Sequence, residues 1–129
     1  MAKRILIVEN NDRDRELLML VLSTRGFAVD TTTDAQQATA FFEQRPPDLL
    51  VVDSDLPDIN GWDFCEDIKH RDGGQSVPLL IVSAQLPMQS RLDGSCADDF
   101  LVKPFDDQKL LEKVHHLLAA NVSNKTEEA

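Results

Sequence analysis

Three short runs of consecutive apolar residues stand out along the chain. They lie at Ile5–Val8, Leu49–Val52 and Leu79–Val82, and each is rich in branched side chains. Unbroken apolar runs of this length are typical of strands buried on both faces, as in a parallel sheet covered by helices. Weaker strands are predicted at Phe27–Thr31 and Phe100–Val102. The pattern therefore predicts five strands.

Segments of helical periodicity separate these runs. Apolar residues recur at helical spacing within four segments, namely Asp12–Arg25, Thr33–Phe42, Trp62–Ile68 and Asp106–Ala120. A fifth segment, Leu86–Asp93, contains a proline and carries only a weak pattern, so we expect the fourth of five helices to be short.

The order strand–helix, repeated five times, predicts an α/β fold. Right-handed crossovers would give a parallel sheet with helices on both faces. A length of 129 residues corresponds to one domain, which we place at residues 1–120. Residues 121–129 show no periodicity and are interpreted as a disordered C-terminal tail. No apolar stretch approaches the ~18 residues of a membrane span.

Charge and cysteine content narrow the function classes. The 13 basic and 23 acidic residues give a net charge of −10, which repels phosphate backbones and anionic lipids. We therefore expect no direct binding to nucleic acid or membranes. Two cysteines, Cys65 and Cys96, are too few for a disulfide framework, and we expect reduced thiols in a cytoplasmic protein.

Polar residues follow four of the predicted strands at the point where each strand ends. Glu9 and Asn10 follow the first strand, Asp53 ends the third, and Ser83 and Lys103 follow the fourth and fifth. In parallel α/β sheets these carboxyl ends converge on one ligand site. Carboxylates with room for water suit Mg²⁺. A lysine and a hydroxyl facing an aspartate suit a phosphoryl group on that aspartate.

With these features in this order, the chain resembles the receiver domain of two-component response regulators, as in chemotaxis response regulators. The resemblance covers residues 3 to about 120, and it implies the flavodoxin-like fold: a doubly wound five-stranded parallel sheet of order 2-1-3-4-5. The motifs that carry it are the acidic tip of the first strand, Pro47–Leu49 before Asp53, Leu56–Pro57 then Gly61, Ser83–Ala84, and Ala97–Phe100 before Lys103–Phe105.

The resemblance also implies roles for individual residues. Asp53 would be the phosphoacceptor, and Ser83 and Lys103 would contact the phosphoryl group. Phe100 stands at the aromatic switch position. The domain would accept its phosphoryl group from a histidine kinase or phosphotransfer protein and change its affinity for a downstream protein partner. It would not be an enzyme beyond self-catalysed phosphoryl transfer and slow autodephosphorylation.

The metal site implied by the resemblance departs from the family pattern at one position. Its ligands for Mg²⁺ would be Glu9, Asn10, Asp53 and the carbonyl of Asp55. Asn10 stands where the family has a carboxylate, so Mg²⁺ binding is expected to be weak. Asn10 could equally cap the following helix, and both roles are compatible. Two acidic residues and a basic one nearby, Asp12, Asp14 and Arg15, are interpreted as a solvated first helical turn.

Two alternatives remain open at this point. With Asn10 in the acidic pair, the domain could be a degenerate receiver that binds partners without phosphorylation. Asp53-Ser54-Asp55 also mimics the Asp-x-Asp motif of haloacid-dehalogenase-type phosphohydrolases, in which the first aspartate is the nucleophile. This motif lacks the following Gly-Thr, and the chain is too short for a cap domain.

Overall fold

The computed structural model describes residues 2–85 and 96–120 in full, and the backbone of residues 121–128. Its strands form one parallel five-stranded sheet of order β2-β1-β3-β4-β5, which confirms the predicted fold class. The strands are β1 (Arg4–Val8), β2 (Ala28–Thr32), β3 (Leu49–Asp53), β4 (Leu79–Ser83) and β5 (Asp99–Val102).

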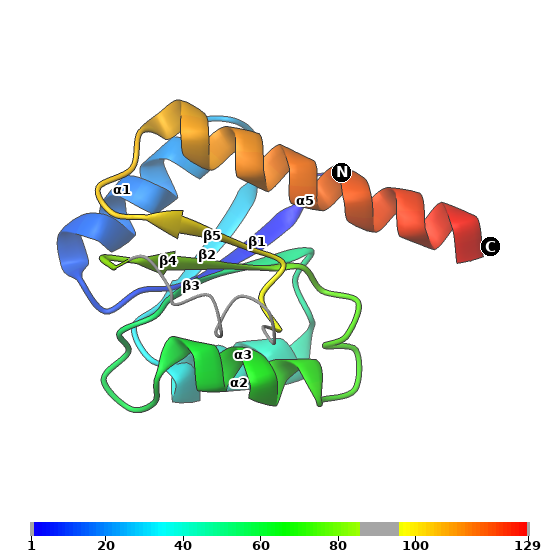
Figure 1. The fold of residues 1–129 in the computed structure, drawn as a ribbon, viewed down its shortest axis with the longest axis horizontal. Coiled ribbons are helices and arrows are strands. Elements are labelled where there is room, and N and C mark those ends of the chain that lie inside the picture. The colour runs from blue at the N-terminus through cyan, green and yellow to red at the C-terminus, as the bar shows by residue number, and fades with distance from the viewer. Residues whose placement is uncertain (1, 86–95, 129) are drawn as a thin grey trace.

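The described helices lie in two layers, one on each side of the sheet. They are α1 (Asp12–Ser23), α2 (Ala35–Gln44), α3 (Gly61–Lys69) and α5 (Asp107–Glu128). Helices α1 and α5 cover one face, and α2 and α3 cover the other (Figure 1). The predicted short fourth helix falls within residues 86–95, which lie outside the described residues.

Alternate residues of the central strands enter two separate cores. Ile5 and Ile7 pack with α1 and α5, whereas Leu6 and Val8 pack with α2 and α3. The residues of β3 and β4 divide in the same way, and all of them are buried. Burial on both faces explains why these strands appear in the sequence as continuous apolar runs.

Side-chain caps begin all four described helices and set their first turns; at α5 the Asp106 side chain accepts the Lys109 N–H at 2.7 Å. Asn11, not Asn10, caps α1, because its side-chain oxygen accepts the Asp14 N–H at 2.9 Å. Asp34 caps α2 and Asn60 caps α3 in the same manner. A cap satisfies backbone N–H groups that have no partner within the helix. The expected capping role of Asn10 is therefore taken by its neighbour.

Helix α5 is longer than its apolar stripe indicated. We expected the helix to end near Ala120, and the structure gives its bounds as Asp107–Glu128. The interpretation of residues 121–129 as a tail outside the domain stays a prediction. Among the residues of this helix whose side chains are described, Leu118 is the last buried one, and the last turns project beyond the sheet (Figure 1). Extending an existing helix needs no new nucleus, so it does not require a buried face.

The two cysteines are paired. Cys65 on α3 and Cys96 before β5 form a disulfide, with their Cα atoms 6.1 Å apart. This pairing corrects the expectation of two reduced thiols. The residues are separated by 31 positions in the sequence, and the folded chain brings α3 and the segment before β5 together.

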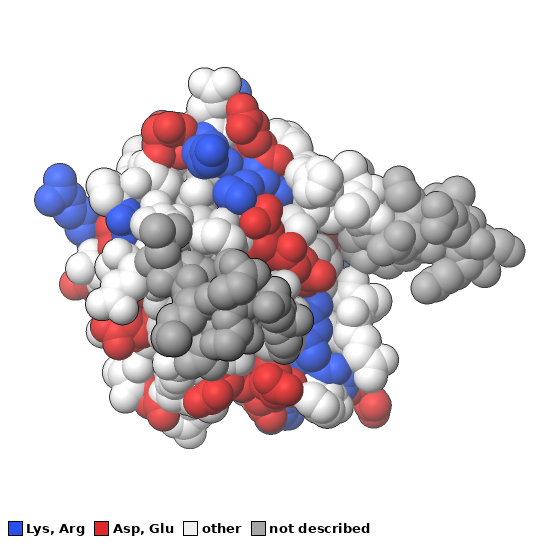
Figure 2. Space-filling view, viewed as in Figure 1, with Lys and Arg blue, Asp and Glu red and all other residues white. Residues whose placement is uncertain are grey.

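The surface reflects the acidic composition. Figure 2 shows acidic side chains gathered along the lower edge, on the side of the sheet that α2 and α3 cover, and basic side chains lying beside acidic ones. Within the described part of the chain, no helix combines the length and hydropathy needed to cross a bilayer.

Candidate functional site

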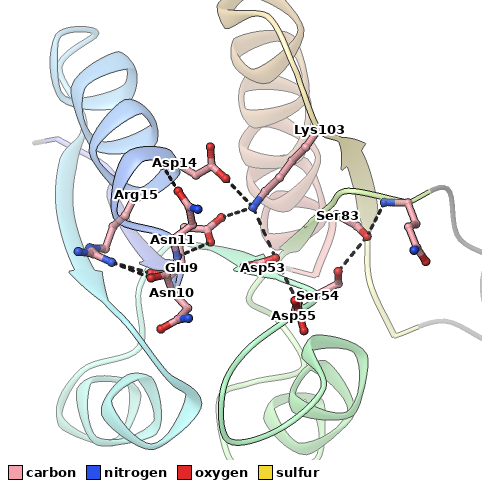
Figure 3. A network of polar contacts seen from close by, with 11 residues as sticks. Glu9, Asn10, Asn11, Asp14, Arg15, Asp53, Ser54, Asp55, Ser83 and Lys103 are labelled. Atoms are coloured by element: carbon pink, nitrogen blue, oxygen red, sulfur yellow. Dashed lines mark hydrogen bonds and ion pairs between the residues drawn. The ribbon is translucent and has the colours of Figure 1, made fainter.

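The strand tips bring the predicted polar residues together at one end of the sheet (Figure 3). Asp53 and Ser83 are the last residues of β3 and β4, and Glu9 and Lys103 directly follow β1 and β5. The carboxyl and hydroxyl groups of Glu9, Asp53 and Ser83 belong to residues that are at least nine-tenths buried. The sheet register thus places two carboxyls, a hydroxyl and an ammonium around one small region.

Lys103 is the charge centre of this region. Its Nζ lies 2.9 Å from Glu9 Oε1, 2.9 Å from Asp14 Oδ2 and 3.7 Å from Asp53 Oδ1. Its backbone N–H donates to the Ser83 carbonyl at 2.7 Å, and a cis peptide bond leads to Pro104. Burial alone would lower the pKa of Lys103, but the ion pairs with Glu9 and Asp14 outweigh it and raise that pKa.

Glu9 is an almost fully buried carboxyl. Burial and the neighbouring Asp53 carboxylate raise the pKa of Glu9 to about 7, against the opposing effects of Lys103 and the Asn11 N–H. The Asn11 N–H donates to Oε2 at 3.1 Å. Oε1 pairs with the Lys103 ammonium but accepts no well-directed hydrogen bond from the described residues. One buried carboxylate oxygen is therefore only partly satisfied.

The backbone around Asp53 is tightly packed. Asp53 Oδ1 accepts the Asp55 N–H at 3.2 Å, which begins the loop after β3. Gly61 then starts α3, and its N–H donates to the Ser54 carbonyl at 2.9 Å. A Cβ atom at Gly61 would lie 2.3 Å from the Asp53 carbonyl oxygen. Only glycine allows the helix to approach Asp53 this closely.

On the other side of Asp53, two hydroxyls face each other. The Oγ atoms of Ser54 and Ser83 share a hydrogen bond of 2.8 Å. Ser83 Oγ also accepts the Gln85 N–H at 3.2 Å. The hydroxyl expected to contact a phosphoryl group is therefore already engaged by neighbours in this state.

The other predicted metal ligands differ in exposure from Glu9 and Asp53. Asn10 and Asp55 are both exposed. Figure 3 shows the Asn10 side chain directed away from Lys103, and the Asn10 carbonyl accepts a long 3.5 Å bond from Arg15. Within the described residues no group of three or more His, Cys, Asp or Glu side chains has a metal-binding arrangement. The two buried carboxyls are the central oxygen donors here.

Phe100 lies away from the charged groups. It is half-buried on β5, where it packs against the core formed with α2 and α3. The Lys113 ammonium lies 5.7 Å from its ring centroid and pairs with Asp99 at 3.1 Å. The structure therefore places Phe100 beside the site, at the edge of the core formed with α2 and α3, rather than among its polar groups.

Sequence reasoning missed three contributors. Asp14 and Arg15 are not a freely solvated turn, because Asp14 binds Lys103 and Arg15 donates to the Glu9 carbonyl at 3.0 Å. Asp12 comes nearest to that interpretation, because 90% of its side chain is exposed, although it pairs with Arg15. In the sequence Ser54 stands out only as the middle residue of an Asp-x-Asp motif. The one available signal was the position of Ser54 directly after the buried strand β3.

The fold and the site place this chain among the parallel α/β domains that have a buried aspartate at the tip of a central strand. Residues 5–115 match the response regulator receiver domain family, and the chain belongs to that family. Receiver domains of two-component response regulators are signalling domains that act as phosphorylation-dependent switches. This assignment replaces the haloacid-dehalogenase-type alternative.

Curated relatives support the same family. The chain is 35% identical to the alkaline phosphatase synthesis transcriptional regulatory protein SphR of Synechococcus elongatus, over 98% of this chain and 52% of that protein. It is 32% identical to the phosphate regulon transcriptional regulatory protein PhoB of Rhizobium meliloti, over 92% of this chain and 53% of that protein. The chain thus spans about half the length of these curated relatives.

Solved structures show the same fold. A putative response regulator from Chloroflexus aurantiacus superposes with a TM-score of 0.86 at 30% identity, covering 92% of this chain and 99% of that one. The receiver domain of a sensor histidine kinase from Pseudomonas aeruginosa, which has a magnesium ion coordinated in its active-site cleft, gives a TM-score of 0.82 at 24% identity over 92% of this chain and 99% of that one. At this identity the second likeness concerns the fold alone.

Proposed function

We propose that this domain is a signalling switch whose phosphoacceptor is Asp53. The observation that carries the proposal is the position of Asp53, a buried carboxylate at the tip of β3 with Lys103 Nζ 3.7 Å from its Oδ1. Ser83 lies at the tip of the adjacent strand, within the same region. An ammonium and a hydroxyl are the groups that pair with and hydrogen-bond a phosphoryl group.

The proposed reaction is phosphoryl transfer from a phosphohistidine. An Oδ atom of Asp53 forms a bond to phosphorus while the nitrogen–phosphorus bond of the phosphohistidine breaks, and the imidazole nitrogen takes up a proton as it leaves. The phosphoryl group adds negative charge beside Asp53. Lys103 and Ser83 then turn toward the new oxygens, and this rearrangement changes the affinity for a protein partner.

Receiver domains bind Mg²⁺, and the residues present fit this ion. Glu9 and Asp53 offer buried carboxylates, and Glu9 Oε1 lacks a well-directed hydrogen bond within the described part of the chain. We assign Glu9, Asp53 and the Asp55 carbonyl as ligands, with Asn10 as an uncharged fourth position that weakens binding. When bound, the ion neutralises charge on the oxygens of the transferred group.

The proposed phosphodonor is a histidine kinase or phosphotransfer protein, and the proposed output is binding to another protein. The curated relatives are named as transcriptional regulatory proteins, and this chain spans about half of their length. The expectation that it does not bind nucleic acid applies to this domain alone and stays a prediction.

The direct test is incubation with a small phosphodonor and Mg²⁺, followed by intact-mass analysis. We expect one phosphoryl adduct on the unchanged chain and none on Asp53→Asn. The matched control is Asp63→Asn, which removes the same charge from an exposed position on α3. This control should label like the unchanged chain.

Two results would contradict the proposal. Persistent labelling of Asp53→Asn would place the phosphoacceptor elsewhere. Absence of labelling in the unchanged chain, with both a small phosphodonor and a phosphorylated histidine protein, would favour the degenerate receiver that binds partners without phosphorylation.

A further inference from the structure

We infer that Asp14 is a positioning residue that holds Lys103 on the β1 side of the site and competes with a phosphoryl group on Asp53 for this ammonium. The inference rests on the proposed function of Asp53. Asp14 belongs to α1 and is not among the residues assigned above to the phosphoryl group or the metal. Its influence would act through Lys103 alone.

The distances around Lys103 favour the β1 side. Its Nζ lies 2.9 Å from both Glu9 Oε1 and Asp14 Oδ2, but 3.7 Å from Asp53 Oδ1. Figure 3 shows the lysine side chain reaching toward the loop after β1, with Asp14 approaching from α1. In this state two carboxylates compete successfully with the phosphoacceptor for the same ammonium.

The Asp14 backbone is fixed in place by the start of α1. The Asp14 N–H donates to the Asn11 side chain at 2.9 Å, so the first turn of the helix has a defined position. Arg15 secures the same turn, because its guanidinium donates to the Glu9 carbonyl at 3.0 Å. The Asp14 side chain is 30% exposed and that of Lys103 is 16% exposed. A partly buried pair of this kind is only partly screened by solvent.

Lys103 is anchored at its backbone but mobile at its end. The Lys103 N–H donates to the Ser83 carbonyl at 2.7 Å, so the chain around it is part of the sheet edge. The four-carbon stem allows the ammonium to move between acceptors without a backbone shift. Two of its three N–H donors are committed to Glu9 and Asp14, so moving fully toward a phosphoryl group on Asp53 draws the ammonium away from one of these contacts. Glu9 is buried, so the more exposed Asp14 is the contact that is cheaper to release.

The test measures binding of beryllofluoride, a phosphoryl mimic, in the presence of Mg²⁺ by calorimetry. Asp14→Asn should bind it about threefold to fivefold more tightly. In this variant Lys103 has no ion pair with residue 14 to break before it contacts the mimic, and a partly exposed ion pair contributes only modestly. Asp14→Glu should restore the affinity of the unchanged chain. Mg²⁺ affinity, measured without beryllofluoride, should be the same in all three proteins.

The matched control is Asp12→Asn. Asp12 lies in the same first helical turn, so its loss changes the net charge and the helix-dipole interaction in the same way. It pairs with Arg15 rather than with Lys103. Beryllofluoride affinity in Asp12→Asn should match that of the unchanged chain, which separates release of Lys103 from a general loss of negative charge.

Four outcomes would overturn the inference. Equal tightening in Asp14→Asn and Asp12→Asn would make the effect a general one of charge. Weaker Mg²⁺ binding in Asp14→Asn would make Asp14 a support of the metal site. Unchanged beryllofluoride affinity in Asp14→Asn, with normal phosphoryl labelling of Asp53, would refute the competition while leaving the proposed function intact. If the unchanged chain and Asp14→Asn both fail to bind beryllofluoride and both fail to be phosphorylated, the proposed function fails and the inference fails with it.

Discussion

The two sides of Asp53 are held by different kinds of interaction. On the β1 and β5 side, Lys103 joins three carboxylates within 2.9–3.7 Å, and one of them, on Glu9, is almost fully buried. On the β4 side, Ser54 and Ser83 share one neutral hydrogen bond. Buried charges interact strongly and carry large desolvation costs, whereas a hydroxyl pair has a short range and a modest net energy. Stability and pH response should therefore be concentrated on the ionic side.

Removing the Lys103 ammonium should have the largest effect on stability and tests the ionic side most directly. In Lys103→Met the carboxylates of Glu9 and Asp53 lose their common partner, and loss of one member of a buried ion pair typically costs about 3–5 kcal/mol. We expect a loss of this size in the free energy of unfolding, measured with urea at pH 8. The loss should shrink at pH 5, where Glu9 is protonated. An equal loss at both pH values would contradict the ionic account.

The pH response of Glu9 gives the next largest effect. Its pKa is raised from 4.5 to about 7 in the folded protein, so between these values the folded state binds more protons than the unfolded state. The contribution of Glu9 to stability is therefore most favourable below pH 4.5 and falls as pH rises through 7, by at most about 3 kcal/mol. Glu9→Gln should lose this dependence. Urea unfolding at pH 5 and pH 8 gives the change in the free energy of unfolding between these pH values for each protein. The same change in the unchanged chain and in Glu9→Gln would refute the prediction.

A carboxylate at residue 10 should increase the affinity of the site for Mg²⁺. Asn10→Asp should tighten Mg²⁺ binding by about 1–3 kcal/mol, since it adds a charge near a hard cation. The control is Asn11→Asp, which adds the same charge at the adjacent residue and preserves the cap of α1. Calorimetric titration compares the two variants. Equal affinities in both would mean that residue 10 does not face the metal.

The smallest effect belongs to the hydroxyl side. Ser54→Ala removes the partner of Ser83 and should lower the free energy of unfolding by about 0.5–1.5 kcal/mol, the net value of a neutral hydrogen bond. Neither hydroxyl titrates, so the loss should be the same at pH 5 and pH 8. Ser76→Ala, at an exposed site with only a long 3.4 Å contact, is the control and should change little. A loss that varied with pH would tie Ser54 to the ionic network.

The parts of the fold that follow from periodicity could be predicted. The continuous apolar runs of β1, β3 and β4 and the start of α1 at Asp12 matched the structure, because burial on both sheet faces leaves a direct mark on composition. The positions of Glu9, Asp53, Ser83 and Lys103 at the strand tips also followed from the order of the elements.

Features that depend on where a side chain points could not be predicted. Asp14 looked like any acidic residue of a first helical turn, and only the geometry of the Asn11 cap aims it at Lys103. The Cys65–Cys96 pair depends on packing between elements that are distant in the sequence. The extension of α5 beyond Ala120 has no apolar stripe to reveal it. Each of these is a three-dimensional relation that leaves no local periodic signal.

The close approach of Gly61 to the Asp53 carbonyl has a consequence for mutational screens. Every side chain at residue 61 would collide with backbone 2.3 Å away, so a saturation library should show this position to be as intolerant as a reactive residue. Gly61 has no reactive group, and its intolerance would report shape rather than chemistry. A map of tolerance around Asp53 would therefore merge two populations, residues that touch the phosphoryl group and residues that merely leave room for it.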